Sequence, residues 1–80
     1  MSKHSHVEID AADPAHTRVW VELHNHEGLD KIVRQYPVEQ RRHAYAMAKN
    51  LADALGLPLK INEGGDQARP IEASDFPTSG

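Results

Sequence analysis

The spacing of apolar residues changes once along this chain of 80 residues, and that change limits the folds it can adopt. Between Arg18 and His24 the apolar residues take every second position, which is the period of a strand with one buried face. Between Val38 and Leu55 they recur every third or fourth residue, as they do along one side of a helix. A chain this short holds one domain, so the sheet and the helix must pack on each other to form a core.

Turn signals divide the rest of the chain into further strands. Residues 5–10 alternate as a first strand, and Asp13-Pro14 marks a turn before the second. Gly28 suits a tight hairpin before a third strand at Lys31–Tyr36, and a short last strand follows the helix at residues 58–62. The order strand-strand-strand-helix-strand predicts an α+β fold. An antiparallel sheet of three to four strands would carry the helix on one face and leave the other face open.

Start and stop residues bound the predicted helix. Pro37 suits the position before it, and the charge of Glu39 favours its first turn. Gly56 ends the helix, Leu57 can fold back on its last turn, and Pro58 prevents its continuation. The candidate core residues of the strands and the helix are Val7, Ile9, Val19, Val21, Leu23, Ile32, Val33, Ala44, Met47, Ala48, Leu51, Leu55, Leu57, Leu59 and Ile61.

Some of these stretches are also found together in a known family. They are Val19-Trp20-Val21, Tyr36-Pro37, and the run Ala44, Ala48, Leu51-Ala52, Gly56 and Leu59. Through them, residues 5–62 resemble a family of short bacterial domains of unknown function. These domains consist of two or three strands, an alanine-rich helix and a closing strand. The resemblance implies the same fold and carries no chemistry with it.

Composition and charge exclude several classes of protein and site. Cysteine is absent, which excludes disulfides, thiolate zinc sites and a cysteine nucleophile. The polar N-terminus is not signal-like and no apolar run is long enough to span a membrane, so we expect a cytoplasmic protein. Residues 63–80 hold four acidic residues and one arginine. The net charge of this segment is therefore −3, which equals the net charge of the whole chain. We predict one domain over residues 1–62 and a flexible, disordered acidic tail over residues 63–80.

Histidine is abundant, with six residues in the chain. If the first two strands pair with Ile9 opposite Val19, ligand-type side chains gather on the side facing away from the core. They are His4, His6, Glu22 and His24. Three imidazoles and one carboxylate suit zinc. Solvent-facing histidines near a terminus need no function, however, and we expect this protein to bind no metal or other cofactor.

The single tryptophan points to a protein interface. Alternation places Trp20 on the face away from Val19 and Val21, where a tryptophan among charged residues is a common interface anchor. The alternative is that Trp20 belongs to the core, with the tail or Tyr36 folded over it. The predicted partner-binding residues are Arg18, Trp20, Glu22, Arg34 and Tyr36.

These observations favour a binding function over catalysis. The serines lie near the termini, and no serine, histidine and acid combine as a triad, so we expect no enzyme. We predict a small non-enzymatic module that binds another protein, or itself as a homodimer, through its open sheet face. Such short, slightly acidic, cysteine-free proteins are typical of phage- or mobile-element-encoded inhibitors of a host complex, anti-CRISPR proteins among them. The alternative is a nucleic-acid-binding domain, disfavoured by the neutral domain charge. It would use Arg18, Trp20, Arg34, Arg41 and Arg42.

Overall fold

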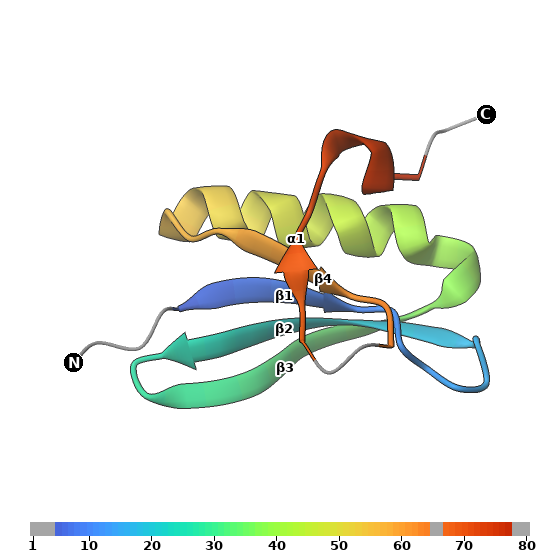
Figure 1. Cartoon of the computed structure of the whole chain (residues 1–80), viewed down its shortest axis with the longest axis horizontal. Coiled ribbons are helices and arrows are strands. Elements are labelled where there is room, and N and C mark those ends of the chain that lie inside the picture. Colours follow the sequence, from blue (N-terminus) through green and yellow to red (C-terminus); the bar gives the residue numbers. More distant parts are fainter. Residues whose placement is uncertain (1–4, 65–66, 78–80) are drawn as a thin grey trace.

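The computed structural model describes residues 5–64 and 67–77, and it confirms the α+β class. One helix lies on one face of a five-stranded sheet with the order β3-β2-β1-β4-β5 (Figure 1). The strands are β1 (His6–Asp10), β2 (Arg18–His26), β3 (Leu29–Pro37), β4 (Leu59–Asn62) and β5 (Arg69–Pro70). The helix is α1 (Arg41–Leu55), and the two short 3-10 turns are η1 (Val38–Gln40) and η2 (Ala73–Asp75).

Two hairpins and the helix determine the direction of each strand. β2 runs antiparallel to β1 and β3 antiparallel to β2, so β3 runs in the direction of β1. α1 then carries the chain back along the sheet, and β4 lies beside β1 in the same direction, with Ile9 opposite Ile61. The expectation of an antiparallel sheet of three to four strands is roughly right, and the structure refines it. The sheet is mixed, because β1 and β4 form a parallel pair, and β5 adds a fifth strand antiparallel to β4.

The loop between β1 and β2 is organised by one carboxylate. Asp13 accepts hydrogen bonds from the backbone N–H groups of Ala15, Thr17 and Arg18 and from the Thr17 hydroxyl. These bonds, above all those from Thr17, lower the pKa of Asp13. The carboxylate thus satisfies backbone donors that the turn leaves without a strand partner.

The two strands that flank this loop, β1 and β2, pair two residues away from the expected register. Ile9 lies opposite Val21 and not opposite Val19. A shift by an even number of residues leaves every side chain on its predicted face, because the side-chain period of a strand is two. The core-facing and open-facing residues of β1 and β2 are therefore as predicted, although the cross-strand neighbours differ.

The core lies between α1 and the sheet. Its buried residues are Val7, Ile9, Val19, Val21, Leu23, Tyr36, Ala44, Tyr45, Ala48, Ala52 and Ile61. Two predicted core residues are wrong: Ile32 is 61% exposed and Leu55 is 40% exposed. A register shift in the β2–β3 pair places Ile32 opposite Glu22, on the side away from α1. Tyr36 and Tyr45 were not predicted in the core and are both buried.

The ends of α1 largely follow the prediction. The expected helical start at Val38 is a 3-10 turn, η1, and the α-helix begins at Arg41. Gly56 takes a left-handed conformation with φ of 68°, and the N–H of Leu57 donates to the carbonyl of Ala52. This is the predicted glycine stop with the following residue folded back. Among the described residues, no helix is long and apolar enough to cross a membrane.

The segment expected to be a flexible tail is docked in the part that the structure describes. β5 pairs with β4, and Ile71 and Phe76 pack against the core. Arg69 forms ion pairs of 2.6 Å with Glu63 and 2.7 Å with Asp75. The expected boundary at residue 62 therefore needs correction, because apolar anchors and a charge clamp extend the domain through residue 77.

Candidate functional site on the open face of the sheet

The face of the sheet opposite α1, here called the open face, carries half of the predicted functional residues. Strand alternation places there His6, Glu8, Asp10, Arg18, Trp20, Glu22, His24, Ile32, Gln35 and Lys60. β1 lies between β2 and β4, so its outward side chains have neighbours on both sides. The side chains of Glu8 and His6 are accordingly only 9% and 12% exposed.

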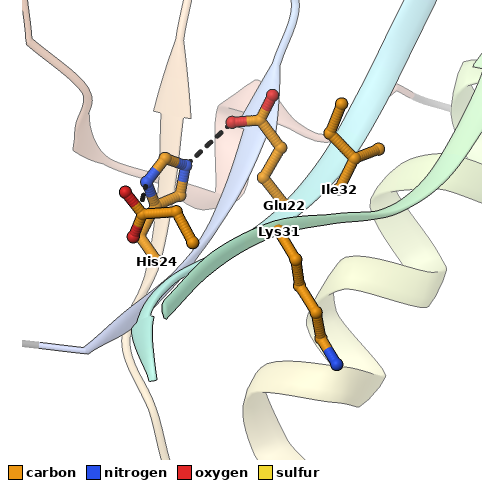
Figure 2. Close-up of a pocket in the computed structure, with 5 residues that line it drawn as sticks. Glu22, His24, Lys31 and Ile32 are labelled. Carbon is orange, nitrogen blue, oxygen red and sulfur yellow. Dashed lines mark hydrogen bonds and ion pairs between the residues drawn. The ribbon is translucent and has the colours of Figure 1, made fainter. Parts of the chain in front are cut away.

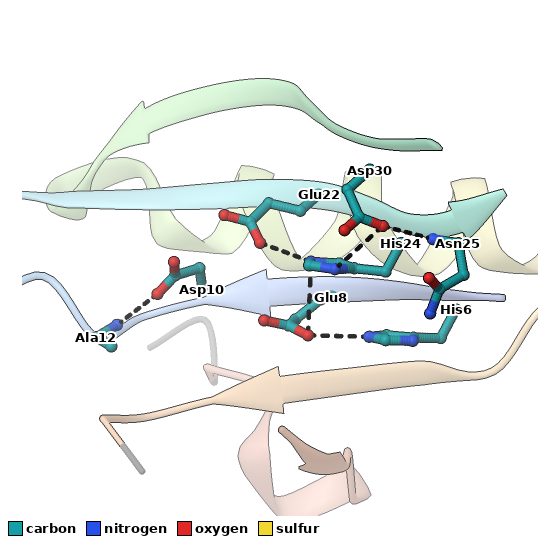
Figure 3. Close-up of polar contacts among 8 residues, drawn as sticks. All are labelled: His6, Glu8, Asp10, Ala12, Glu22, His24, Asn25 and Asp30. Atoms are coloured by element: carbon teal, nitrogen blue, oxygen red, sulfur yellow. Dashed lines mark hydrogen bonds and ion pairs between the residues drawn. The ribbon is translucent and has the colours of Figure 1, made fainter. Parts of the chain in front are cut away.

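Four of these residues form a compact group, here called the His-Glu cluster: His6, Glu8, Glu22 and His24. Nε2 of His6 lies 2.9 Å from Oε1 of Glu8, and Nε2 of His24 lies 2.8 Å from Oε1 of Glu22. Nε2 of His24 is also 3.6 Å from Oε1 of Glu8. The two imidazole rings stack in parallel, with centroids 4.8 Å apart (Figure 3). Both Nε2 atoms therefore converge on the same carboxylate oxygen.

Burial and neighbouring charges raise the pKa of Glu22 in this cluster. Glu8 is a buried charged residue, with 7% of its surface exposed. Burial is the largest cause that raises the pKa of Glu22, and the charges of Asp10 and Glu8 add to it, whereas His24 lowers it. The site therefore concentrates negative charge in a partly desolvated place, where a cation or a proton is favoured.

A shallow depression of about 420 Å³ borders the cluster (Figure 2). Its lining residues are Glu22, His24, Asp30, Lys31 and Ile32. Lys31 points toward the helix side, away from Glu22 and His24. Oδ1 of Asp30 lies 3.8 Å from Nδ1 of His24 and accepts a hydrogen bond of 2.7 Å from the N–H of Asn25. Asp30 thus faces the outer nitrogen of His24 (Figure 3).

Trp20 lies on the open face, as predicted from the alternation. Its indole Nε1–H donates to Oε1 of Gln35 across the β2–β3 pair, at 3.0 Å, and the side chain is half-buried. The exposed Ile32 lies on the same face. It is the β3 partner of Glu22, which is two residues after Trp20 in β2. Tyr36 does not cover Trp20, because Tyr36 lies opposite Val19 in the core.

Arg34 and Tyr36 are separated from the other predicted partner-binding residues. Both face the helix side of the sheet, since they pair with Val21 and Val19. The guanidinium of Arg34 lies over the Tyr36 ring, 5.3 Å from its centroid. The prediction of one surface with Trp20 and Glu22 is therefore wrong for Arg34 and Tyr36, because the register shift in β3 changes which residues share a face.

The arginines proposed for nucleic-acid binding do not gather around Trp20 either. Arg41 and Arg42 are exposed in the first turn of α1, and Arg34 lies on the helix side of the sheet. Only Arg18 alternates with Trp20 on the open face. Base stacking on an aromatic residue requires cations beside it for the phosphates, and carboxylates occupy most of those places here.

The predicted metal-ligand set is brought together in part. His6, Glu22 and His24 lie in one cluster, whereas His4 lies outside the described residues. Sequence reasoning missed Glu8. The signal was present, because His6-Val7-Glu8 in one strand and Glu22-Leu23-His24 in the next are mirror images, and antiparallel pairing of such segments brings like residues opposite each other.

Comparison with protein-family models, with curated proteins and with solved structures gives no match for this chain. The resemblance to short bacterial strand-strand-strand-helix-strand domains therefore stays a prediction, and the residues of the open face carry the functional argument.

Proposed function

We propose that this chain is a non-enzymatic protein-binding module whose open face binds a basic surface of another protein. The observation that carries the proposal is the pairing of apolar and acidic groups on that face. Trp20 and the exposed Ile32 supply apolar contact area, and tryptophan is enriched among the residues that dominate interface energies. α1 packs on the other side of β1, β2 and β3 and leaves these side chains accessible.

The charge of the open face supports a basic partner. Its carboxylates are Glu8, Asp10, Glu22 and Asp30, and its permanent cations are Arg18 and Lys60. With histidines neutral, the acids outnumber the bases, as they do over the whole chain, whose net charge is −3. Such a surface attracts a positively charged patch and accelerates the encounter with it.

A basic groove on a host complex is one partner of this chemistry. An inhibitor carried by a phage or mobile element would use the acidic face to occupy such a groove. The part of residues 63–80 that the structure describes is less suited to this role, since Arg69 pairs with Glu63 and Asp75. We place the interaction in the cytoplasm on the sequence grounds given above.

Capture from a lysate of the source or its host, with and without nuclease, tests the proposal. The matched variants are Ile32→Glu on the open face and Leu55→Glu on α1, both at exposed apolar positions. Trp20→Ala and Glu22→Lys address the anchor and the charge separately. Circular dichroism and thermal melting would establish that each variant is folded.

Support would be a captured protein with a basic binding surface, retained after nuclease treatment and by Leu55→Glu and lost with Ile32→Glu and Glu22→Lys. The purified pair should then bind at least about tenfold more weakly after Trp20→Ala. Nucleic acid as the only captured species would overturn the proposal. A dimer in sedimentation that Ile32→Glu dissociates would overturn it too, because the partner would be a second copy of this acidic chain.

A further inference from the structure

We infer that His6, Glu8 and His24 form a binding site for Zn²⁺ or a chemically similar divalent transition-metal ion on the open face. This site needs no protein partner to form, although it lies on the same open face and a bound ion offsets the charges of Glu8 and Glu22 that the proposed partner would meet. Neutral imidazole and carboxylate are zinc ligands, and a set of two histidines and one glutamate is an established zinc-binding combination. The further argument rests on the geometry, the register and the outer contacts of these three residues.

The three ligand atoms are close enough to share one ion. One ligand atom from each of His6, Glu8 and His24 lies within 4.8 Å of the other two. With metal–ligand bonds of about 2.0–2.1 Å, two ligands of a tetrahedral ion lie about 3.3 Å apart. The distances from Oε1 of Glu8 to Nε2 of His6 and of His24 are 2.9 and 3.6 Å, on either side of this value. Coordination of one ion therefore requires the two imidazole rings to turn out of their parallel stack, so that both Nε2 lone pairs point at the ion.

The strand register gives an independent reason for a cation at this position. His6 lies directly opposite His24, and Glu8 lies directly opposite Glu22. Like charges directly opposite each other in an antiparallel pair are destabilising. The two carboxylates together carry the charge that neutralises one divalent ion, and Glu8 is largely removed from water. A metal ion bound by Glu8, with Glu22 beside it, offsets this repulsion.

The outer contact of His24 is similar to the arrangement found around metal-bound histidines, with a carboxylate near the other ring nitrogen but beyond hydrogen-bond distance. Nε2 of His24 faces the cluster, while Nδ1 faces the Asp30 carboxylate at 3.8 Å (Figure 3). A metal-ligating histidine commonly directs its other ring nitrogen toward a carboxylate, which fixes the tautomer and strengthens the ligand. Asp30 is itself held by the backbone N–H of Asn25. Asp30 is therefore assigned as a positioning residue for His24.

Protonated imidazoles are the competing explanation of the cluster. Two imidazolium groups would also neutralise Glu8 and Glu22, without any metal. The two explanations differ in what they predict for added metal. Protonated histidines repel a divalent cation, whereas the proposed site binds one ion per chain.

Calorimetric titration with Zn²⁺ tests the site, after bound metal has been removed with a chelator and the chelator has itself been removed. We expect one ion per chain, and a rise in melting temperature of about 10 °C at a free Zn²⁺ concentration of 100 times Kd. His24→Ala and Glu8→Gln should each weaken binding at least about 100-fold, and Asp30→Asn about 10-fold. The control is His43→Ala, which removes an exposed histidine of α1. It should leave the affinity unchanged.

Co²⁺ as a probe shows the coordination directly, including for a variant that folds poorly. A four-coordinate Co²⁺ site absorbs strongly in the visible range, and the wild-type protein should show this absorption. ¹⁵N resonances of the His6 and His24 side chains should shift on Zn²⁺ addition, and that of His43 should not. Absence of binding at millimolar Zn²⁺, or equal loss of affinity in His43→Ala and His24→Ala, would overturn the assignment.

Discussion

Tyr45 of α1 and Phe76, the residue that follows η2, pack edge to face, with ring centroids 5.9 Å apart and planes at 68°. This contact connects the end of the described chain to the helix. Tyr45 is buried, and burial is the largest cause that raises the pKa of its hydroxyl. The aromatic pair therefore makes the segment after β5 part of the folded domain.

Removal of this contact should destabilise the whole domain. We expect Phe76→Ala to lower the free energy of unfolding by about 2 kcal/mol, less than for a fully buried phenylalanine because Phe76 is partly exposed. Urea denaturation followed by circular dichroism measures the change. A difference below about 0.5 kcal/mol would show that this segment contributes nothing to the fold.

Two isoleucines provide a matched test of which sheet face forms the core. Ile9 is fully buried beneath α1, and Ile32 is 61% exposed on the open face. Ile9→Ala should cost about 2–5 kcal/mol of unfolding free energy, and Ile32→Ala about 0.5 kcal/mol or less. Equal losses in urea denaturation would mean that the open face is covered in solution.

The helix stop at Gly56 depends on backbone conformation alone. Its φ is 68°, and a Cβ atom added there would meet no other atom within 4 Å. Gly56→Ala should therefore destabilise the protein by about 1–2 kcal/mol through left-handed strain, without any steric clash. Gly56→Asn should cost less, because asparagine tolerates this conformation. Thermal melting of the two variants measures the difference, and equal melting temperatures would contradict the explanation.

The Arg69 clamp should add a pH dependence to stability. Hydrogen bonds from Arg69 are the main cause that lowers the pKa of Asp75 from 3.8 to about 2. Because the folded pKa is the lower one, the contribution is complete well above pH 3.8 and is lost as the pH falls through about 2. Asp75→Asn should melt below the wild type at pH 6, and the two should converge near pH 2. A constant difference across that range would exclude Asp75 as its source.

Much of this fold was predictable because local signals and tertiary packing agree. The alternation in β2 and the three-to-four spacing in α1 each identify one buried side. The glycine stop at Gly56 requires only the local sequence. The position of β4 in the sheet was not predictable in the same way, because nothing in Leu59–Asn62 itself encodes which strand it joins after α1.

The candidate site was predictable only in part for a related reason. Successive side chains of a strand alternate between the two faces, so the face of a residue follows from whether its position is odd or even. His6, Glu22 and His24 were therefore placed together correctly. The identity of cross-strand neighbours needs the register, which the Asp13 loop shifts by two residues, and so Glu8 was missed. Arg34 and Tyr36 were assigned to the wrong face because a register shift in the β2–β3 pair interrupts the alternation of side chains along β3.

The position of β1 has a consequence for the order in which the domain is completed. β1 is synthesised early, yet its parallel neighbour β4 ends only at Asn62. Without β4 in place, a β1–β2–β3 meander leaves one side of β1 unpaired. An unpaired strand edge that carries Val7 and Ile9 favours association with other chains. The pairing of β4 with β1 therefore removes an edge at which the chain could associate with other chains.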